Sequence, residues 1–428
     1  MLESASHLRL SLVCARGSPI ADMLTHSPLP LLIDHFDKYH DITAEDEEGI
    51  ILALQHRDRV RRIRLRKSVS ISQRVVNALD GEFPILEYLL IEPQQFHWPF
   101  IAGTMNLPKT FRAPRLRHLL LMSFDFGIES PLITTRTTAS LVTLTLNSIP
   151  PSAYFDPNAL LQRVSLMPQL EILEIFFIQN LDFPRNDIER QLLHTPIPTR
   201  VTLSNLRCLG FKGASVYLES LLCQVTIPLL KKLQVYFFKE PTYSIPQLQQ
   251  FMSTAENFRP NATTFTIHHH FLEVTAYPHK GAGIYTLYVS LDGQGLDWQV
   301  ASAARVCRTL RTVFSTVKHL TIKYYGINRS SWRVEPDRTQ WRELLRTFVN
   351  VKTLFVGRDY AGQLFHALQP DEGESPTELL PELQELSYPP IFSSVNTFTP
   401  FIDARQRAGR PVTLIHVSDS LLLGSLSG

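Results

Sequence analysis

The chain has 428 residues, of which 44% are hydrophobic and 19% charged, and its 42 basic and 40 acidic residues leave a formal charge of +2. So small an excess gives no reason to expect nucleic acid or a membrane surface as a partner. No apolar run approaches the roughly 18 residues that a membrane-spanning helix needs. The four cysteines lie far apart, in no disulfide or zinc pattern, which favours an intracellular protein, cytoplasmic or nuclear, with reduced thiols.

Helix and strand signals alternate from the start of the chain. A predicted helix over 19–26 precedes a predicted strand over 28–37. Thr43 is a good N-cap for a helix over 43–58, whose acidic first turn and basic end suit the helix dipole. Serines open a further predicted helix over 70–81, with Gly81 as its C-cap.

The same alternation continues towards the C-terminus. Asp156 followed by Pro157 predicts the start of a helix over 156–166. Further helices are predicted over 244–258, 296–314 and 335–349, and residues 397–417 predict one more helix and strand. Two alternating runs joined by a Gly-rich link predict a hairpin-like insertion, or a divergent repeat, over 271–293. Residues 418–428 are expected to form a mobile tail.

One phrase recurs along the chain. "MPQLEILEIFF", at 167–177, reads Pro-x-Leu-x-x-Leu-x-aliphatic, and further copies stand at 83–91, 113–121, 227–235 and 380–388. With the copies that lack the proline, the first apolar positions are separated mostly by 24 to 36 residues: 60, 86, 116, 141, 170, 206, 230, 262, 317, 351 and 383.

A period near thirty built on Leu-x-x-Leu-x-Leu is typical of a leucine-rich repeat. Because helices alternate with strands that are expected to run in one direction, the sequence predicts an α/β leucine-rich-repeat solenoid, a horseshoe with a curved parallel sheet. We expect a single irregular solenoid over 1–417. The alternative is a set of unrelated buried strands in an α/β domain, which would also be rich in leucine.

The repeat register predicts which side chains line the concave face. Arg62, Arg64 and Arg66 follow one another on one strand and could bind an acidic segment, a phosphopeptide or an inositol phosphate. The alternative is a solvated row neutralised by the acidic residues of 43–49 or by Glu92.

The remaining strands complete the predicted face. A cluster of exposed aliphatic and aromatic groups is typical of a protein interface, unless loops or the 271–293 segment cover it. Beyond the arginines, the candidate residues are Tyr88, Leu90, Glu92, His118, Leu120, Met122, Thr143, Thr145, Asn147, Ile172, Glu174, Phe176, Lys232, Gln234, His319, Lys323, Thr353 and Phe355.

Signals for catalysis are few, and we predict a non-enzyme without cofactor or metal. No phosphate-binding loop or nucleophile elbow occurs. His268 and His270 would share a face of a strand and could hold a metal if a third ligand arrived; the alternative is a polar strand end beside solvent.

Several segments resemble F-box/leucine-rich-repeat-like proteins of the type abundant in mushroom-forming fungi, and the likeness covers nearly the whole chain. They include "PIADMLTHSPLPLLIDHFD", "MPQLEILEIFF" and "LDWQVAS". The resemblance implies the substrate-receptor part of an F-box-type ubiquitin ligase adaptor, which binds a protein ligand.

The chain departs from that family at its N-terminus. No Leu-Pro…Trp…Leu-Trp segment precedes Pro28, and the first tryptophan is Trp98. The F-box is therefore expected to be missing, and a Skp-type adaptor to bind only if a longer form carries one. The alternatives are an uncharacterised enzyme or metal-binding protein using the His268–His270 cluster, and a non-functional remnant of an expanded family.

Overall fold

In the computed structural model, the protein forms two compact units. The first is Met1–Gly210 with Gln224–Leu230, and the second is Phe211–Cys223 with Lys231–Gly428. The described residues are 12–15, 17–36, 43–67, 73–93, 105–124, 139–150, 153–178, 200–238, 244–254, 259–268, 271–277, 286–292, 296–325, 338–371, 373–389 and 398–416. The predicted tail over 418–428 lies outside them, and the expectation of one continuous solenoid over 1–417 stays a prediction.

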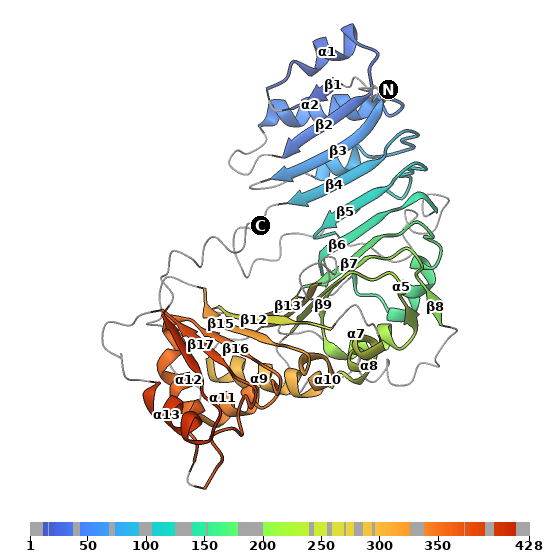
Figure 1. The fold of residues 1–428 in the computed structure, drawn as a ribbon. Helices are drawn as coiled ribbons and strands as arrows, with labels where there is room; N and C mark the ends of the chain where they lie inside the picture. The colour runs from blue at the N-terminus through green and yellow to red at the C-terminus, as the bar shows by residue number, and fades with distance from the viewer. Residues whose placement is uncertain are drawn as a thin grey trace, which may run out of the picture. The chain divides into compact units, whose positions relative to one another are not determined.

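The N-terminal unit contains a parallel sheet whose strands follow the order of the chain (Figure 1). Every pair of neighbours from β1 to β7 is parallel. Beside it, β8 (Val201–Thr202) and β10 (Val225–Thr226) form a small parallel pair. The strands of the main sheet are β1 (Leu12–Cys14), β2 (Leu31–Phe36), β3 (Val60–Lys67), β4 (Tyr88–Pro93), β5 (His118–Met122), β6 (Thr143–Ile149) and β7 (Ile172–Phe177), and β9 (Cys208–Gly213) crosses the unit boundary.

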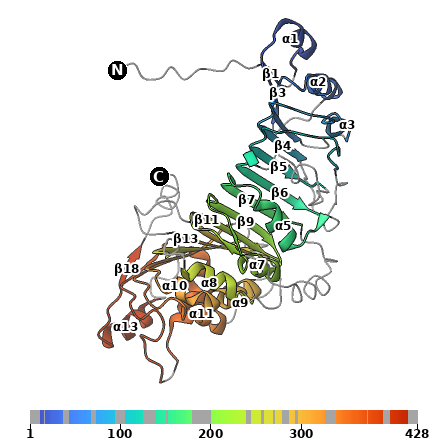
Figure 2. The ribbon, with the colours of Figure 1, turned by 90° about the vertical axis from the view of Figure 1, so that its right-hand side faces the viewer.

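Helices of this unit lie on one side of the sheet (Figure 2). They are α1 (Ile20–His26), α2 (Ala44–Gln55), α3 (Gln73–Asn77) and α5 (Pro157–Val164). Thr43 caps α2 in a capping box with Asp46, and the Asp156 carboxylate accepts from the Asn158 N–H at the start of α5. The predicted C-cap of α3 was wrong: that helix ends at Asn77, because Leu79 N–H bonds Val76 O in a tighter turn, and Gly81 with its φ of +90° lies beyond the turn.

The repeated leucines form the core of each repeat. Leu86, Leu116, Leu170 and Leu230 are at most 3% exposed, and the apolar residues that follow them in β4, β5 and β7 are also buried. Because each strand buries the leucines of its own repeat in the core, consecutive strands pack side by side in register. The recurring phrase is therefore a structural unit.

The C-terminal unit repeats the strand–helix alternation around a mostly parallel sheet. Its strand order is β11-β14-β13-β12-β15-β16-β17-β18, and helices lie along the sheet (Figure 1). The elements are α7 (Ser215–Leu222), β11 (Lys232–Phe237), α8 (Pro246–Thr254), β12 (Ala262–Ile267), β13 (Phe271–Tyr277), β14 (Thr286–Asp292), α9 (Leu296–Thr309), α10 (Arg311–Phe314), β15 (His319–Tyr324), α11 (Arg338–Leu345), β16 (Thr353–Val356), the 3₁₀ turn η4 (Arg358–Tyr360), α12 (Ala361–Leu368), β17 (Glu385–Tyr388), α13 (Thr399–Arg407) and β18 (Thr413–His416).

One strand breaks the parallel order of this sheet, and it lies in the segment 271–293 for which the sequence suggested a hairpin-like insertion or a divergent repeat. β13 pairs antiparallel with both β12 and β14. Only 268–270 separate β12 from β13, and His268 N–H donates to Phe271 O across that turn. So short a link cannot carry the crossover that parallel neighbours need, and the chain must reverse. With this exception, both units consist of strand–helix repeats, and the chain has an α/β leucine-rich-repeat fold.

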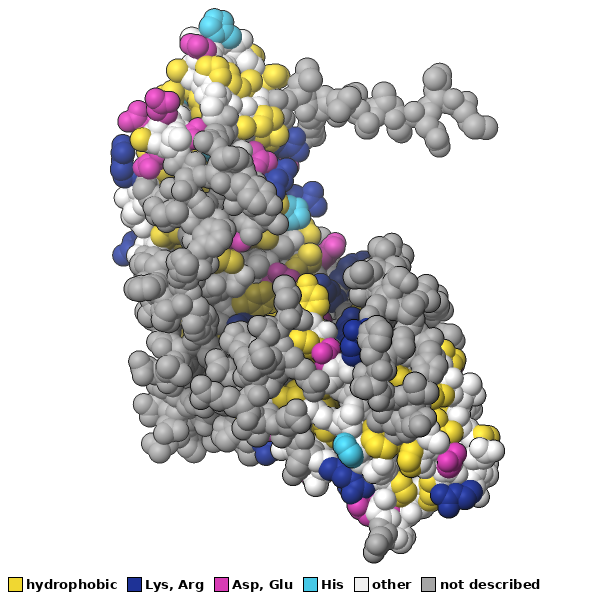
Figure 3. All heavy atoms as spheres, turned by 90° about the vertical axis from the view of Figure 1, so that its left-hand side faces the viewer, with side chains coloured by type: hydrophobic (Ala, Val, Ile, Leu, Met, Phe, Trp, Pro, Cys, Tyr) yellow, Lys and Arg dark blue, Asp and Glu magenta, His cyan; other side chains and the backbone are white. Residues whose placement is uncertain are grey.

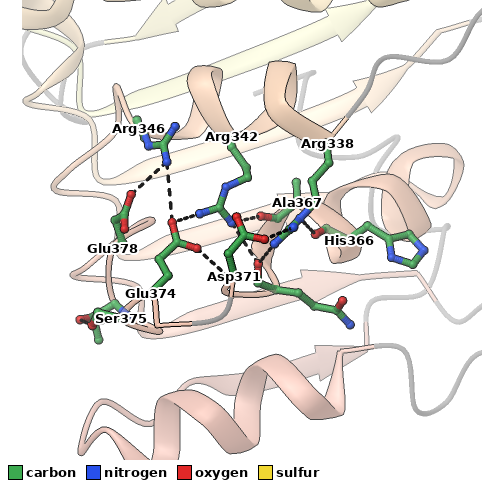
Figure 4. Close-up of polar contacts among 11 residues, drawn as sticks. Arg338, Arg342, Arg346, His366, Ala367, Asp371, Glu374, Ser375 and Glu378 are labelled. Carbon is green, nitrogen blue, oxygen red and sulfur yellow. Dashed lines mark hydrogen bonds and ion pairs between the residues drawn. The ribbon is translucent and has the colours of Figure 1, made fainter.

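Arginines hold the loop after α12 to α11 (Figure 4). Arg342, only 4% exposed, donates to the carbonyl oxygens of Ala367 (2.9 Å) and Gln369 (3.0 Å) and pairs with Glu374. One turn earlier, Arg338 pairs with Asp371. Burial alone would raise the pKa of Glu374, but the hydrogen bonds around its carboxylate and the charge of Arg342 outweigh burial and lower it.

Arg405 of α13 has a similar role in the next repeat. Its side chain is fully buried, and it donates to Leu380 O (3.3 Å), Pro381 O (3.2 Å) and Leu383 O (3.1 Å). Those carbonyls belong to the turn that leads into β17. Leu380 O also accepts from the Leu383 N–H at 3.0 Å. The guanidinium therefore adds a donor there and supplies the donor for the carbonyls of Pro381 and Leu383, which the turn would otherwise leave unpaired.

Candidate binding face of the N-terminal unit

Parallel pairing aligns the predicted face residues of this unit in rows across the strands. Arg62 pairs with Tyr88, Tyr88 with His118, His118 with Thr143 and Thr143 with Ile172. Two residues further along each strand, the second row runs through Arg64, Leu90, Leu120, Thr145 and Glu174. The structure thus brings together the candidate residues of β3 to β7.

Most of these side chains are half-buried. Tyr88, Glu92, Leu120, Met122, Ile172, Glu174 and Phe176 all keep part of their surface in solvent. Leu90 and Thr143 are buried at 9% and 8% exposure, so these two offer little to a ligand. The half-buried side chains together form a face that is partly apolar and partly polar.

The arginine row is only partly available. Arg64 forms an ion pair with Asp34 of β2 at 3.2 Å, a partner that the sequence alone did not suggest. Arg66 pairs with Glu92 in strand register, but the Arg66 side chain lies outside the described part of the structure. Arg62 is the one predicted arginine whose side chain is described without a carboxylate partner among the described residues.

A pocket of about 350 Å³ opens where strands β3, β4 and β5 begin. It combines positive, negative and aromatic side chains. Figure 3 shows basic, acidic and histidine side chains beside hydrophobic ones in the upper part of the view, on this unit. Its lining is Leu32, Arg61, Arg62, Glu87, Tyr88, Arg117 and His118.

Contacts within the pocket fix its side chains. The Arg61 guanidinium donates to Glu87 Oε2 at 2.8 Å. The Arg62 guanidinium carbon lies 4.7 Å from the centre of the Tyr88 ring, a cation–π contact. The Tyr88 and His118 ring centres are 5.7 Å apart, so the pocket has a cationic side and an aromatic wall.

His118 connects the pocket to the next strand through a hydrogen bond between its Nδ1 and Thr143 Oγ1 at 3.1 Å. Burial, and next the charge of Arg117, lower the pKa of the imidazole, with Glu87 opposing them. His118 is therefore neutral at pH 7.

Further along the face, Glu174 accepts from Thr145 Oγ1 at 2.9 Å. Gly210 leaves room beside it: a Cβ there would lie 2.8 Å from Glu174 Cγ and 3.0 Å from Phe176 Cζ. A larger residue at 210 would push both side chains aside. The absence of a side chain thus shapes this part of the face.

Sequence reasoning missed Arg61, Glu87 and Arg117, which stand one residue before the predicted rows. Backbone bonds align them, since Glu87 N–H donates to Arg61 O and Arg117 N–H to Glu87 O. The signal was present, because the residue after the first apolar position is charged in most repeats. In the repeats from Val60 to Leu206 these residues are Arg61, Glu87, Arg117, Glu171 and Arg207.

The other candidates lie in the C-terminal unit. Phe355 of β16 pairs with Thr321 and Ser387, and Thr353 with His319 and Glu385. His268 stacks on Phe271 with ring centres 4.0 Å apart, and its Nε2 lies 3.5 Å from Glu273 Oε2. His270 lies outside the described residues. Within the described part of the chain, no three His, Cys, Asp or Glu side chains are grouped to hold a metal ion.

No helix among the described residues has the length and apolar character needed to cross a bilayer. No family model and no curated protein matches the sequence.

Two solved structures show a weak likeness to this chain. A chain of the TLR13–ssRNA13 complex is 12% identical with a TM-score of 0.40, and the match covers 95% of this chain and 49% of that one. The leucine-rich repeat-containing protein LegL7 from Legionella pneumophila is 10% identical with a TM-score of 0.30. That match covers 94% of this chain and 99% of the LegL7 chain. This chain therefore spans about half the length of the TLR13 chain. At such scores the two likenesses say nothing about what this chain binds.

Proposed function

We propose that the chain is a protein-recognition module that binds its ligand on the face of the β3–β7 sheet that carries these rows of side chains. The observation that carries the proposal is the in-register, half-exposed row of aromatic, aliphatic and charged side chains on one parallel sheet. Tyr88, Leu120, Met122, Ile172 and Phe176 keep apolar surface in water, at a cost of about 25 cal/mol per Å² that a protein partner would remove. Such a patch with a polar rim suits a protein interface.

Site-specific photo-crosslinking tests this proposal. A benzophenone amino acid replaces Leu120 on the face or, as the control, Gln162 on the exposed side of α5. We expect one dominant protein adduct from position 120 in a lysate of the source cells, and none from 162. Adduct formation at 120 should fall at least tenfold when Met122→Glu or Phe176→Glu is added, but not with Lys109→Glu, an exposed position away from this face. Equal adducts from 120 and 162, or no response to the face variants, would refute it.

We further propose that the module is the substrate-receptor part of an F-box-type ubiquitin ligase adaptor. What supports this is the sequence resemblance, which covers nearly the whole chain. A Skp-type adaptor would then bind a longer form that carries an F-box. Expressing the longest transcript of the gene with a Skp-type adaptor tests it: co-purification of the long form and not of residues 1–428 is expected, and failure of the long form to bind would remove the ligase assignment while leaving protein recognition untouched.

A further inference from the structure

The pocket at the starts of β3, β4 and β5 holds more positive than negative charge. Arg61, Arg62 and Arg117 line it against one carboxylate, that of Glu87. His118 adds no charge at pH 7, since burial and then Arg117 lower its pKa. Two positive charges therefore remain unmatched by the described lining.

The three guanidiniums differ in how they are engaged. Arg61 is paired with Glu87 at 2.8 Å. Arg62 is held over Tyr88 and pairs with no carboxylate of the described residues. Arg117 is exposed and pairs with no carboxylate in that part of the chain. Two sets of N–H donors thus remain for a ligand.

We propose that this pocket binds a phosphorylated side chain of the protein ligand, an inference that rests on the proposed function. A phosphoryl group carries about −1.5 to −2 charges near neutral pH and three acceptor oxygens. It would neutralise the two unmatched guanidiniums, which a single carboxylate could not. Arginine also matches phosphate oxygens with paired donors.

The size and walls of the pocket favour a side chain over a small free anion. About 350 Å³ is far more than one phosphate group fills, and Leu32, Tyr88 and His118 supply surface for an apolar stem. A polyphosphorylated inositol would bring more negative charge than two guanidiniums neutralise. A phosphorylated residue on a peptide fits both the charge and the walls.

Other arginines of this unit are already neutralised, which provides a matched control. Arg64 pairs with Asp34 at 3.2 Å, and Arg207, in the same row as Arg117, lies 3.9 Å from Glu171. Like Arg117, Arg207 is exposed. Substituting Arg117 or Arg207 should therefore leave the fold intact. Of these two arginines, only Arg117 belongs to the pocket.

Binding of degenerate peptide pools to the full chain tests the proposal. Each pool has a fixed central residue, phosphoserine, phosphotyrosine, serine or glutamate, and binding is measured by fluorescence anisotropy at low salt. We expect at least one phosphorylated pool to bind about tenfold or more tighter than the serine pool and also tighter than the glutamate pool, as charge-assisted bonds imply. Arg117→Gln and Arg62→Gln should each abolish the difference, Arg207→Gln should keep it, and higher salt should weaken it.

Equal binding of all pools, or an unchanged preference in Arg117→Gln, would overturn the proposal. So would inositol hexakisphosphate binding through Arg117 while no phosphorylated pool binds. The crosslink at position 120 separates the two levels. An adduct that persists after phosphatase treatment of the lysate would leave protein recognition standing and the phosphoryl pocket refuted, whereas loss of the adduct after that treatment would support both. Absence of any adduct at 120 would refute the recognition face itself.

Discussion

Two arginines of the C-terminal unit, Arg342 and Arg405, donate to carbonyl oxygens of neighbouring loops, whereas two arginines of the N-terminal pocket have no such acceptors among the described residues. Arg342 and Arg405 are almost fully buried and donate to loop carbonyls, while Arg62 and Arg117 line an open pocket without a carboxylate partner among the described residues. Arg59 shows that the N-terminal unit also uses the first arrangement, because it donates to the carbonyls of Leu24 and Leu29. What distinguishes a structural arginine from a binding one is the number of acceptors already around it.

The largest expected effect comes from removing the most enclosed guanidinium. Arg405→Leu leaves the carbonyl oxygens of Pro381 and Leu383 without their donor, whereas Leu380 O keeps the Leu383 N–H. At about 1–3 kcal/mol for each orphaned acceptor, the free energy of unfolding of the C-terminal unit should fall by about 3 kcal/mol or more in urea denaturation. Arg407→Leu, at an exposed position on the same helix, should change it by less than about 0.5 kcal/mol. Similar losses in the two variants would contradict a structural role for Arg405.

A smaller effect is expected at Glu374, which accepts from Arg342 in the loop after α12. Glu374→Gln should cost about 2 kcal/mol at pH 7, since a bond to a charged group is lost. The pKa of Glu374 is lowered in the fold from 4.5, so its contribution is present above pH 4.5 and is lost as the pH falls through the folded pKa.

Urea denaturation between pH 7 and pH 3 checks this prediction. The difference between wild type and Glu374→Gln should shrink as the pH falls below 4.5, whereas Glu378→Gln, at a more exposed position, should show a smaller difference throughout. A gap between wild type and Glu374→Gln that is independent of pH would count against the charged pair.

The smallest effect is expected at His35 of β2 in the N-terminal unit. Burial lowers its pKa from 6.5, although Asp46 and Asp34 draw it upward, and its Nε2 is buried without a hydrogen-bond partner. Because the unfolded chain binds the proton more tightly, stability is full above about pH 6.5 and decreases as the pH falls below it. We expect a loss of about 1 kcal/mol, because protonation places a charge on an imidazole whose burial disfavours it.

Hydrogen exchange read separately for the two units checks the His35 prediction. Peptides from β2 and α2 should exchange faster at pH 5.5 than at pH 7, after correction for the intrinsic rate, while peptides from β16 and β17 should not. His35→Leu should remove the difference and His319→Gln, at an exposed position of β15, should keep it. Equal responses of the two units would show that acid acts on something other than His35.

Much of the fold was readable from the sequence because its signal is local. Each repeat is marked by buried apolar residues three and five positions after its first leucine. Counting two positions on from Leu86 and from Leu116 placed Tyr88 beside His118. The Gly-rich link between two alternating runs suggested the hairpin of β13 and β14. The antiparallel pairing of β13 with β12 was not predicted, since an alternating run suits either direction and only the short link after β12 decides it. The partner of Arg64 was missed because β2 lacks the recurring phrase and its register with β3 shifts between Leu31 and Leu32. Arg405 gave no signal either, because its burial depends on a turn more than twenty residues away.

The in-register rows have a consequence for how such a surface can diversify. Neighbouring row positions such as Tyr88 and His118 come from strands about thirty residues apart, and inward leucines hold each strand in place. An outward side chain can therefore be exchanged without disturbing the backbone of its neighbours. Related chains can acquire new ligands one strand at a time, and a designer could regraft single positions of this sheet while leaving its repeats as they are.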